Sequence, residues 1–197
     1  LSTHDQFFMM AEGGKIDYAS HANDGGTVLR EVLDFDDAIK VAYDFYMQHP
    51  DETLIVVTAD HETGGMALGN SDYTLNLKVL AEQKCSSDLL SDQLSALQKE
   101  AGKYLTWEQV KEVISKNTGL YTVVEISTEE DQLLQAAFEQ MMQHQGVEKS
   151  LYKDINALAS KALALLNQKS RLGWTSKGHT ASAVPVFAIG VGAERFT

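Results

Sequence analysis

The sequence has very little cysteine and few basic residues, and both shortages limit what it can do. Its one cysteine, Cys85, cannot form an internal disulfide, so cysteine usage indicates no redox compartment. Lysine and arginine number 16 against 28 acidic residues, the formal net charge is −12, and no Lys/Arg-rich run is present. Nucleic acids and anionic membranes are bound by clustered basic residues, so we expect neither as a partner.

The sequence also lacks an apolar run of transmembrane length, a visible signal peptide at Leu1 and an initiator Met. An apolar run at residues 7–10 follows the first residues almost at once. Natural domains seldom begin so abruptly, so we expect that sequence has been removed upstream of Leu1.

Apolar residues make up 44% of the 197 residues, which is enough for a hydrophobic core. Short apolar runs predict three buried strands, at residues 6–11, 53–58 and 184–189. Apolar positions at helical spacing predict a helix over about residues 36–49, with Asp34 or Asp36 as its N-terminal cap. The order strand, helix, strand predicts a parallel βαβ unit.

The middle of the sequence has a different pattern, rich in Leu, Ala, Gln, Lys and Glu. Thr106 with Gln109, and Ser127 with Glu130, have the spacing of capping boxes, and a further helix is predicted over about residues 148–167. We expect structural helices here, without metal ligands or nucleophiles. The predicted organisation is an α/β core of residues 1–74 and 170–197, interrupted by a helical insertion of residues 75–169.

A first polar segment follows the first predicted strand. Asp17 and His21 are four residues apart, so a helix places them on one face, where a carboxylate and an imidazole can reach one metal ion. Glu12 lies just past the strand, and two glycines after it allow a sharp turn. Taken alone, the segment is better explained by a helix N-terminus with an ordinary surface Asp/His pair.

A second polar segment follows the most hydrophobic strand, where ligands bind in open α/β sheets. Neighbouring residues of a strand point to opposite faces, so Asp60 and His61 can share a metal only where the chain turns. Gly64 and Gly65 favour such a turn. The alternative is a capped strand end with a solvated Asp and His.

A third histidine, His179, lies just before the last predicted strand and is uninformative alone. Together the three segments offer nitrogen and oxygen ligands without thiolate, which fits catalytic zinc. A carboxylate such as that of Glu12 suits magnesium better.

These motifs resemble those of alkaline phosphatases. The matching runs are Glu-Gly-Gly-x-Ile-Asp-x-x-x-His, Thr-Ala-Asp-His-Glu-Thr-Gly-Gly and Gly-His-Thr before Val-Pro-Val-Phe-Ala-x-Gly, over about residues 7–68 and 174–196. The resemblance implies an α/β fold with a central, mostly parallel sheet and flanking helices. It also implies a homodimer, two zinc ions with a nearby magnesium, small phosphate monoesters as substrates, and a periplasmic or secreted full-length protein.

By motif position, the resemblance implies six metal ligands. Those of the first zinc are Asp17, His21 and His179, those of the second zinc are Asp60 and His61, and that of magnesium is Glu12. Tyr18 occupies a position that faces the phosphate, so it is a candidate substrate-binding residue with a neutral hydroxyl. The serine nucleophile and phosphate-binding arginine of the family are expected upstream, so this chain is expected to be inactive alone.

Two other functions remain open at this point. Another metallohydrolase of the same superfamily, a phosphodiesterase, phosphonate hydrolase or phosphoglycerate mutase, uses similar Asp/His sets, although the Glu-Gly-Gly-x-Ile-Asp run favours a monoesterase. The second alternative is a non-catalytic module that folds around metal or without it. The phosphatase hypothesis predicts that His179 lies beside Asp17 and His21, with Asp60 and His61 at a neighbouring ion about 4 Å away and Glu12 facing the same cleft.

Overall fold

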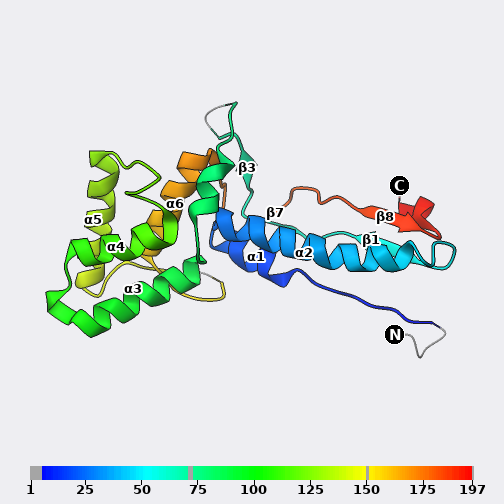
Figure 1. The fold of residues 1–197 in the computed structure, drawn as a ribbon, viewed down its shortest axis with the longest axis horizontal. Helices are drawn as coiled ribbons and strands as arrows, with labels where there is room; N and C mark the ends of the chain where they lie inside the picture. Colours follow the sequence, from blue (N-terminus) through cyan, green and yellow to red (C-terminus); the bar gives the residue numbers. More distant parts are fainter. Residues whose placement is uncertain (1–5, 71–72, 150, 197) are drawn as a thin grey trace.

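The computed structural model describes residues 6–70, 73–149 and 151–196. The helices are α1 (Gly14–His21), α2 (Gly25–Tyr46), α3 (Ser87–Ala101), α4 (Trp107–Thr118), α5 (Thr128–Met142) and α6 (Ala157–Ser170), with 3-10 turns η1 (Leu77–Glu82), η2 (Gly102–Tyr104) and η3 (Ala193–Phe196). The strands are β1 (Leu54–Val57), β2 (Glu62–Thr63), β3 (Ala67–Leu68), β4 (Val147–Glu148), β5 (Ile155–Asn156), β6 (Leu172–Gly173), β7 (His179–Thr180) and β8 (Phe187–Gly190). Helices α3–α6 gather at one end of the molecule and the β1–β8 ribbon lies at the other (Figure 1).

The strands of the described residues form four two-stranded antiparallel pairs, β1–β8, β2–β7, β3–β6 and β4–β5. Three of these pairs join residues 54–68 to residues 172–190, so two distant parts of the chain run together. The β3–β6 pair lies at the base of the helical segment, where the chain leaves and returns. The chain therefore returns from the helical segment to the residues that follow β1.

The expected parallel βαβ unit is absent from the described residues. Residues 6–11, predicted as its first strand, pair with no strand in this part of the chain, and the side chains of Phe8 and Met10 are 91% and 82% exposed. The prediction was wrong because a short apolar run predicts burial but does not supply the neighbouring strand that a ladder of hydrogen bonds requires.

The two other predicted strands form, but they pair with each other and stay partly exposed. β1 and β8 are antiparallel, from Leu54 opposite Gly190 to Val57 opposite Phe187. Leu54 and Val56 are exposed on one face of the ribbon, and Phe187 and Ile189 are exposed on the other, because directly opposed residues share a face. The prediction of buried strands was therefore wrong for this chain.

Helix α2 begins eleven residues earlier than the apolar spacing predicts. Its N-terminal cap is Asp24, whose side chain accepts a hydrogen bond from Thr27 N at 3.1 Å. Asp34 and Asp36, the predicted caps, lie inside the helix. The cap was missed because Gly25 and Gly26 at the start of a helix resemble a turn in sequence.

The capping boxes predicted in the helical segment are confirmed. Thr106 and Ser127 each cap a helix, α4 and α5, with reciprocal bonds from Gln109 and Glu130. The helix predicted from residue 148 begins only at Ala157, because residues before it form the β4–β5 hairpin. Within the described residues, no helix combines the length and hydropathy needed to span a membrane.

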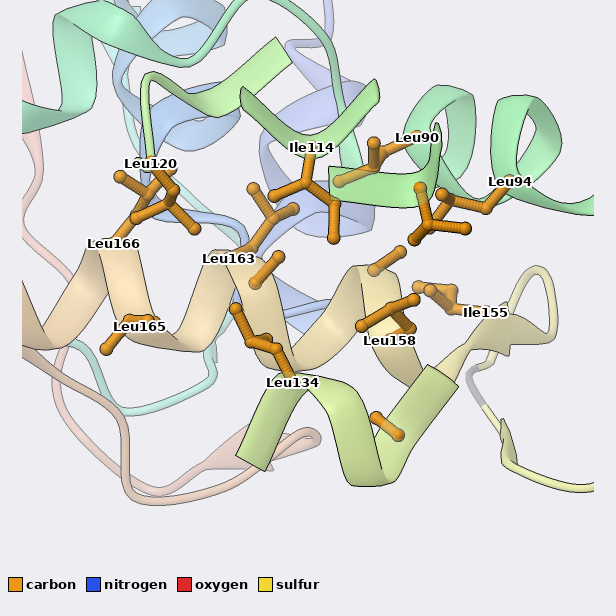
Figure 2. Packing of buried hydrophobic residues seen from close by; sticks show 14 of the residues in the cluster. Leu90, Leu94, Ile114, Leu120, Leu134, Ile155, Leu158, Leu163, Leu165 and Leu166 are labelled. Atoms are coloured by element: carbon orange, nitrogen blue, oxygen red, sulfur yellow. The ribbon is translucent and has the colours of Figure 1, made fainter. Parts of the chain in front are cut away.

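The hydrophobic core of the described residues lies almost wholly in the helical segment. Every member of the main buried cluster falls between Leu80 and Leu172. Helix α6 runs through its centre, and Leu158 and Leu166 are fully buried there (Figure 2). This packing suits a helical insertion with its own core. The proposed division, an α/β core of residues 1–74 and 170–197 with an insertion of residues 75–169, stays a prediction.

A buried carboxylate joins the first two helices to this core. Asp24 is 1% exposed and accepts hydrogen bonds from Thr27 N and Oγ1, Gln83 Nε2 and Ser87 N at 3.1, 2.8, 2.6 and 2.7 Å. One side chain therefore caps α2 and also binds both the residue after η1 and the first residue of α3.

We expect Asp24→Ala to lower the free energy of unfolding by about 3 kcal/mol, because it strands several buried donors at once. Urea denaturation measures this change. Asp36→Ala, at an exposed position of α2, is the matched control and should change the free energy by less than about 0.5 kcal/mol. Equal effects of the two substitutions would show that the Asp24 junction does not stabilise the fold.

Candidate metal centre

Helix α1 brings the first two predicted ligands together. The helix spans Gly14–His21, so Asp17 and His21 lie one turn apart on the same face. Asp17 Oδ1 is 3.4 Å from His21 Nε2. The predicted pairing on one helix face is confirmed.

The third predicted ligand joins them through the β2–β7 pair. Thr63 lies opposite His179 in this pair. His179 Nε2 is 3.2 Å from His21 Nε2 and 3.8 Å from Asp17 Oδ1. Residues 158 positions apart in sequence thus meet at one point, as the sequence motifs predicted.

The three facing atoms form a triangle with the dimensions of a metal coordination site. Its sides are 3.2, 3.4 and 3.8 Å. A point equidistant from the three atoms is about 2 Å from each, and zinc bonds to nitrogen and oxygen are about 2.0–2.2 Å long. The spacing of the three atoms is therefore compatible with one metal ion between them.

The ring of His21 is oriented by the backbone of the segment that carries His179. His21 Nδ1 is 2.6 Å from the carbonyl oxygen of Lys177, and a carbonyl only accepts hydrogen bonds, so Nδ1 donates. In the neutral ring this leaves the lone pair on Nε2, the atom that faces the centre. His21 is 4% exposed, so its orientation is also fixed by packing.

Both oxygens of Asp17 accept hydrogen bonds from hydroxyl groups. Thr63 Oγ1 donates to Oδ1 at 2.6 Å, and the Tyr152 hydroxyl donates to Oδ2 at 2.8 Å. Burial raises the pKa of Asp17, but these two hydrogen bonds and the nearby His21 and His61 outweigh it, so the pKa lies below its usual value. The group is therefore a carboxylate at neutral pH.

The turn after β1 places Asp60 and His61 at the edge of this cluster. His61 Nε2 is 3.3 Å from Asp60 Oδ2. The ring of His61 stacks on that of His179, with 3.5 Å between centroids. The strand has ended at Val57, as this arrangement requires, and the sharing of one metal by Asp60 and His61 stays a prediction.

The glycines predicted to make this turn also hold the two ligand segments together. Gly64 and Gly65 have φ of 86° and 59°, a conformation that favours glycine. Gly64 N donates to Gly178 O at 2.9 Å, next to His179. A Cβ on Gly65 would lie 1.8 Å from Thr175 Oγ1, so the close approach of the two segments excludes larger residues.

Two overlapping sets of three ligands share Asp17 and His179. One contains His21, as the motifs predicted, and the other contains His61, with ligand atoms all within 4.8 Å of one another. The ring of His21 is fixed by Lys177, whereas that of His61 stacks on His179. The assignment of His61 with Asp60 to a neighbouring ion stays a prediction.

The two remaining predicted site residues lie outside these sets. Among the described residues the ligand groups do not include Glu12, whose exposed carboxylate lies over Gly14 at the start of α1. The ring of Tyr18 stacks on that of Tyr152 at 3.7 Å, and Lys15 Nζ lies 4.7 Å from its centroid. The proposed roles of Glu12 at magnesium and of Tyr18 at substrate stay predictions.

Tyr152 is the site residue that sequence reasoning missed. It lies between β4 and β5, in the segment predicted to be purely structural, and no sequence pattern distinguishes it from other loop tyrosines. Its hydrogen bond to Asp17 raises the pKa of the Tyr152 hydroxyl to about 12, so the hydroxyl is protonated and donates at neutral pH. The helical segment therefore contributes a donor to a predicted metal ligand.

Comparison with known proteins identifies the same family that the sequence motifs resemble. The sequence model of the alkaline phosphatase family matches residues 2–197. Alkaline phosphatase 4 of Bacillus subtilis is 32% identical over 191 residues, covering 96% of this chain and 36% of that protein. The repressible alkaline phosphatase of Saccharomyces cerevisiae is 29% identical, covering 92% of this chain and 31% of that protein.

Solved structures resemble the fold as well. The cold-active alkaline phosphatase of Shewanella sp. superposes with a TM-score of 0.70 at 31% identity, over 94% of this chain and 40% of that chain. The Thermus thermophilus alkaline phosphatase gives 0.63 at 26% identity, over 92% and 38%. The chain spans about a third of the length of the curated relatives it matches.

We expect Thr63→Val to raise the pKa of Asp17 in the metal-free chain, because valine keeps the shape and removes one donor to the carboxylate. Stabilisation by a carboxylate with a lowered pKa is present above the unfolded pKa and is lost as pH falls through the folded pKa. In Thr63→Val, this stabilisation by the Asp17 carboxylate should therefore be lost at a higher pH than in the parent chain. Carbon-13 NMR of the Asp17 carboxyl group measures the titration.

Thr122→Val is the control, because Thr122 Oγ1 donates only to Gly119 O, at 2.9 Å, within the helical segment. It should leave the Asp17 titration unchanged. The same Asp17 pKa in Thr63→Val and the parent would mean that Thr63 does not hold the carboxylate in solution.

Proposed function

The chain belongs to the alkaline phosphatase family, and we propose that Asp17, His21 and His179 form a zinc site of a phosphate monoester hydrolase. The observation that carries this proposal is the triangle of three ligand atoms from α1 and β7. Its dimensions suit one zinc ion, and its donors, two imidazoles and one carboxylate, are those of catalytic zinc sites.

The surrounding residues prepare these donors for a metal. Lys177 fixes the tautomer of His21 through its carbonyl oxygen. Thr63 donates to Asp17 Oδ1 and lies 3.2 Å from His61 Nδ1, so one hydroxyl orients a ligand of each of the two proposed ions. A zinc ion held there supplies Lewis acidity to the oxygens of a phosphate ester.

The proposal extends to a second zinc at Asp60 and His61 and to magnesium near Glu12. The proximity of Asp60 to His61, and the stacking of His61 on His179, support the second zinc. For Glu12, the support is its motif position and the preference of magnesium for carboxylate oxygens. Tyr18 remains the proposed contact to the substrate phosphate.

The complete enzyme is proposed to hydrolyse small phosphate monoesters through a phosphoserine, with the serine and a phosphate-binding arginine outside these residues. A homodimer and a periplasmic or secreted location are proposed by family membership. The two other functions left open by the sequence, another superfamily metallohydrolase and a non-catalytic module, have less support. The relatives are named alkaline phosphatases, and the metal ligands converge.

A central, mostly parallel sheet is proposed for the complete fold. The support is the β1–β8 ribbon, whose exposed side chains include Leu54, Val56 and Phe187. Apolar side chains on a two-stranded ribbon call for a covering layer, and its outer edges can accept further strands.

We expect zinc to stabilise the chain by about 2.7 kcal/mol at a free concentration of 100 times its dissociation constant. The measurement is the melting curve with zinc and with a chelator, together with elemental analysis. Asp17→Asn should abolish most of the shift, whereas Asp36→Asn, on an exposed part of α2, should retain it. An unchanged melting curve and no bound zinc in the parent chain would contradict the proposed site.

We also expect the chain alone to show no zinc-dependent hydrolysis of an aryl phosphate. An enzyme that reacts through a covalent intermediate loses a factor of around 10⁶ in catalytic rate when its nucleophile is removed. A complete alkaline phosphatase in the same assay is the positive control. Turnover by this chain near the rate of the control would show that the nucleophile lies within these residues.

A further inference from the structure

Tyr152 is where the helical segment reaches the metal centre. Its hydroxyl donates to Asp17 Oδ2 at 2.8 Å. Its ring lies edge-on to that of His21, with 5.6 Å between centroids, and stacks on Tyr18 at 3.7 Å. A single side chain from the segment expected to be structural therefore contacts two of the three proposed ligands of the first zinc.

The loop that carries Tyr152 is fixed from two directions. On one side, Lys153 Nζ bonds both carboxylate oxygens of Asp92 on α3, at 2.7 and 2.8 Å. On the other side, Glu148 forms an ion pair with Lys177, the residue whose carbonyl orients His21. The position of Tyr152 is thus tied both to the helical core and to the strand segment that presents His179.

The geometry points to Tyr152 as a positioning residue that makes Asp17 bind zinc through one oxygen. The Tyr152 hydroxyl engages Oδ2, whereas Oδ1, which also accepts from Thr63, lies 3.4 and 3.8 Å from the Nε2 atoms of His21 and His179. A carboxylate without such a donor can rotate and bind a metal through both oxygens. This inference rests on the proposed function, since it requires that Asp17, His21 and His179 hold the ion.

The effect of the hydroxyl on zinc can be separated from its effect on stability. Tyr152 is 48% exposed, so its hydrogen bond contributes little to folding. The chain also contains a matched contact remote from the centre. The Tyr121 hydroxyl donates to Asp131 Oδ1, again at 2.8 Å, within the helical segment.

The test compares Tyr152→Phe with Tyr121→Phe in the 197-residue chain. Phenylalanine keeps the ring that stacks on Tyr18 and removes only the hydroxyl. Loss of a hydrogen bond to a metal ligand weakens metal affinity by about 10–100-fold. We expect the dissociation constant for Zn²⁺, measured by competition with a chromophoric chelator, to rise by at least about tenfold in Tyr152→Phe and to stay unchanged in Tyr121→Phe.

A spectroscopic measurement identifies the mechanism. Co²⁺ in place of Zn²⁺ has visible absorption bands whose intensity falls as coordination increases from four to five. Tyr152→Phe should therefore show weaker bands than the parent chain, because the freed Oδ2 joins the coordination. Tyr121→Phe should show the parent spectrum.

The possible failures are distinguishable. Parent-like zinc affinity and cobalt spectrum in Tyr152→Phe would overturn the positioning role and leave the zinc site intact. Equal loss of affinity in both tyrosine variants would also overturn it, because the effect would then not depend on Asp17. Absence of zinc binding by the parent chain would overturn the proposed function, and this inference with it.

Discussion

The pairing of β2 with β7 is the contact on which the candidate metal centre depends. It sets Thr63 opposite His179, and so brings the residues that follow β1 against the residues that follow the helical segment. The turn at Gly64 extends the contact by a backbone hydrogen bond to Gly178. Without this pairing, His179 would not be held beside α1, and Asp17 and His21 alone would supply only two ligands.

Hydrogen bonds around the centre act mainly by selecting orientations. A carbonyl oxygen decides which nitrogen of His21 faces the centre, and two hydroxyl donors decide how the carboxylate of Asp17 is turned. These partners come from three separate parts of the chain, which makes the geometry of the ligands a property of the whole fold. Their positions match the principle that outer contacts fix the tautomer and direction of metal ligands.

The two ends of the molecule differ in how they bury apolar surface. The helical end has a closed core, in which α6 is surrounded by α3, α4, α5 and η1. At the other end, α2 and the β1–β8 ribbon leave large side chains such as Leu33, Val41 and Phe187 exposed. The candidate centre lies between them, and Asp24 and Tyr152 are the two polar links to the helical core described above.

The sequence by itself determined the local features: the Asp17–His21 spacing on a helix, the two capping boxes, the glycine turn and the ligand types that identify the family. These depend on residues close in sequence, whose geometry follows from backbone periodicity. The tertiary structure alone decided the antiparallel pairing of β1 with β8, the lack of a partner strand for residues 6–11 within the described residues and the arrival of Tyr152 at Asp17. Such contacts join residues more than a hundred positions apart or need a partner strand, and neither condition leaves a pattern in a single sequence.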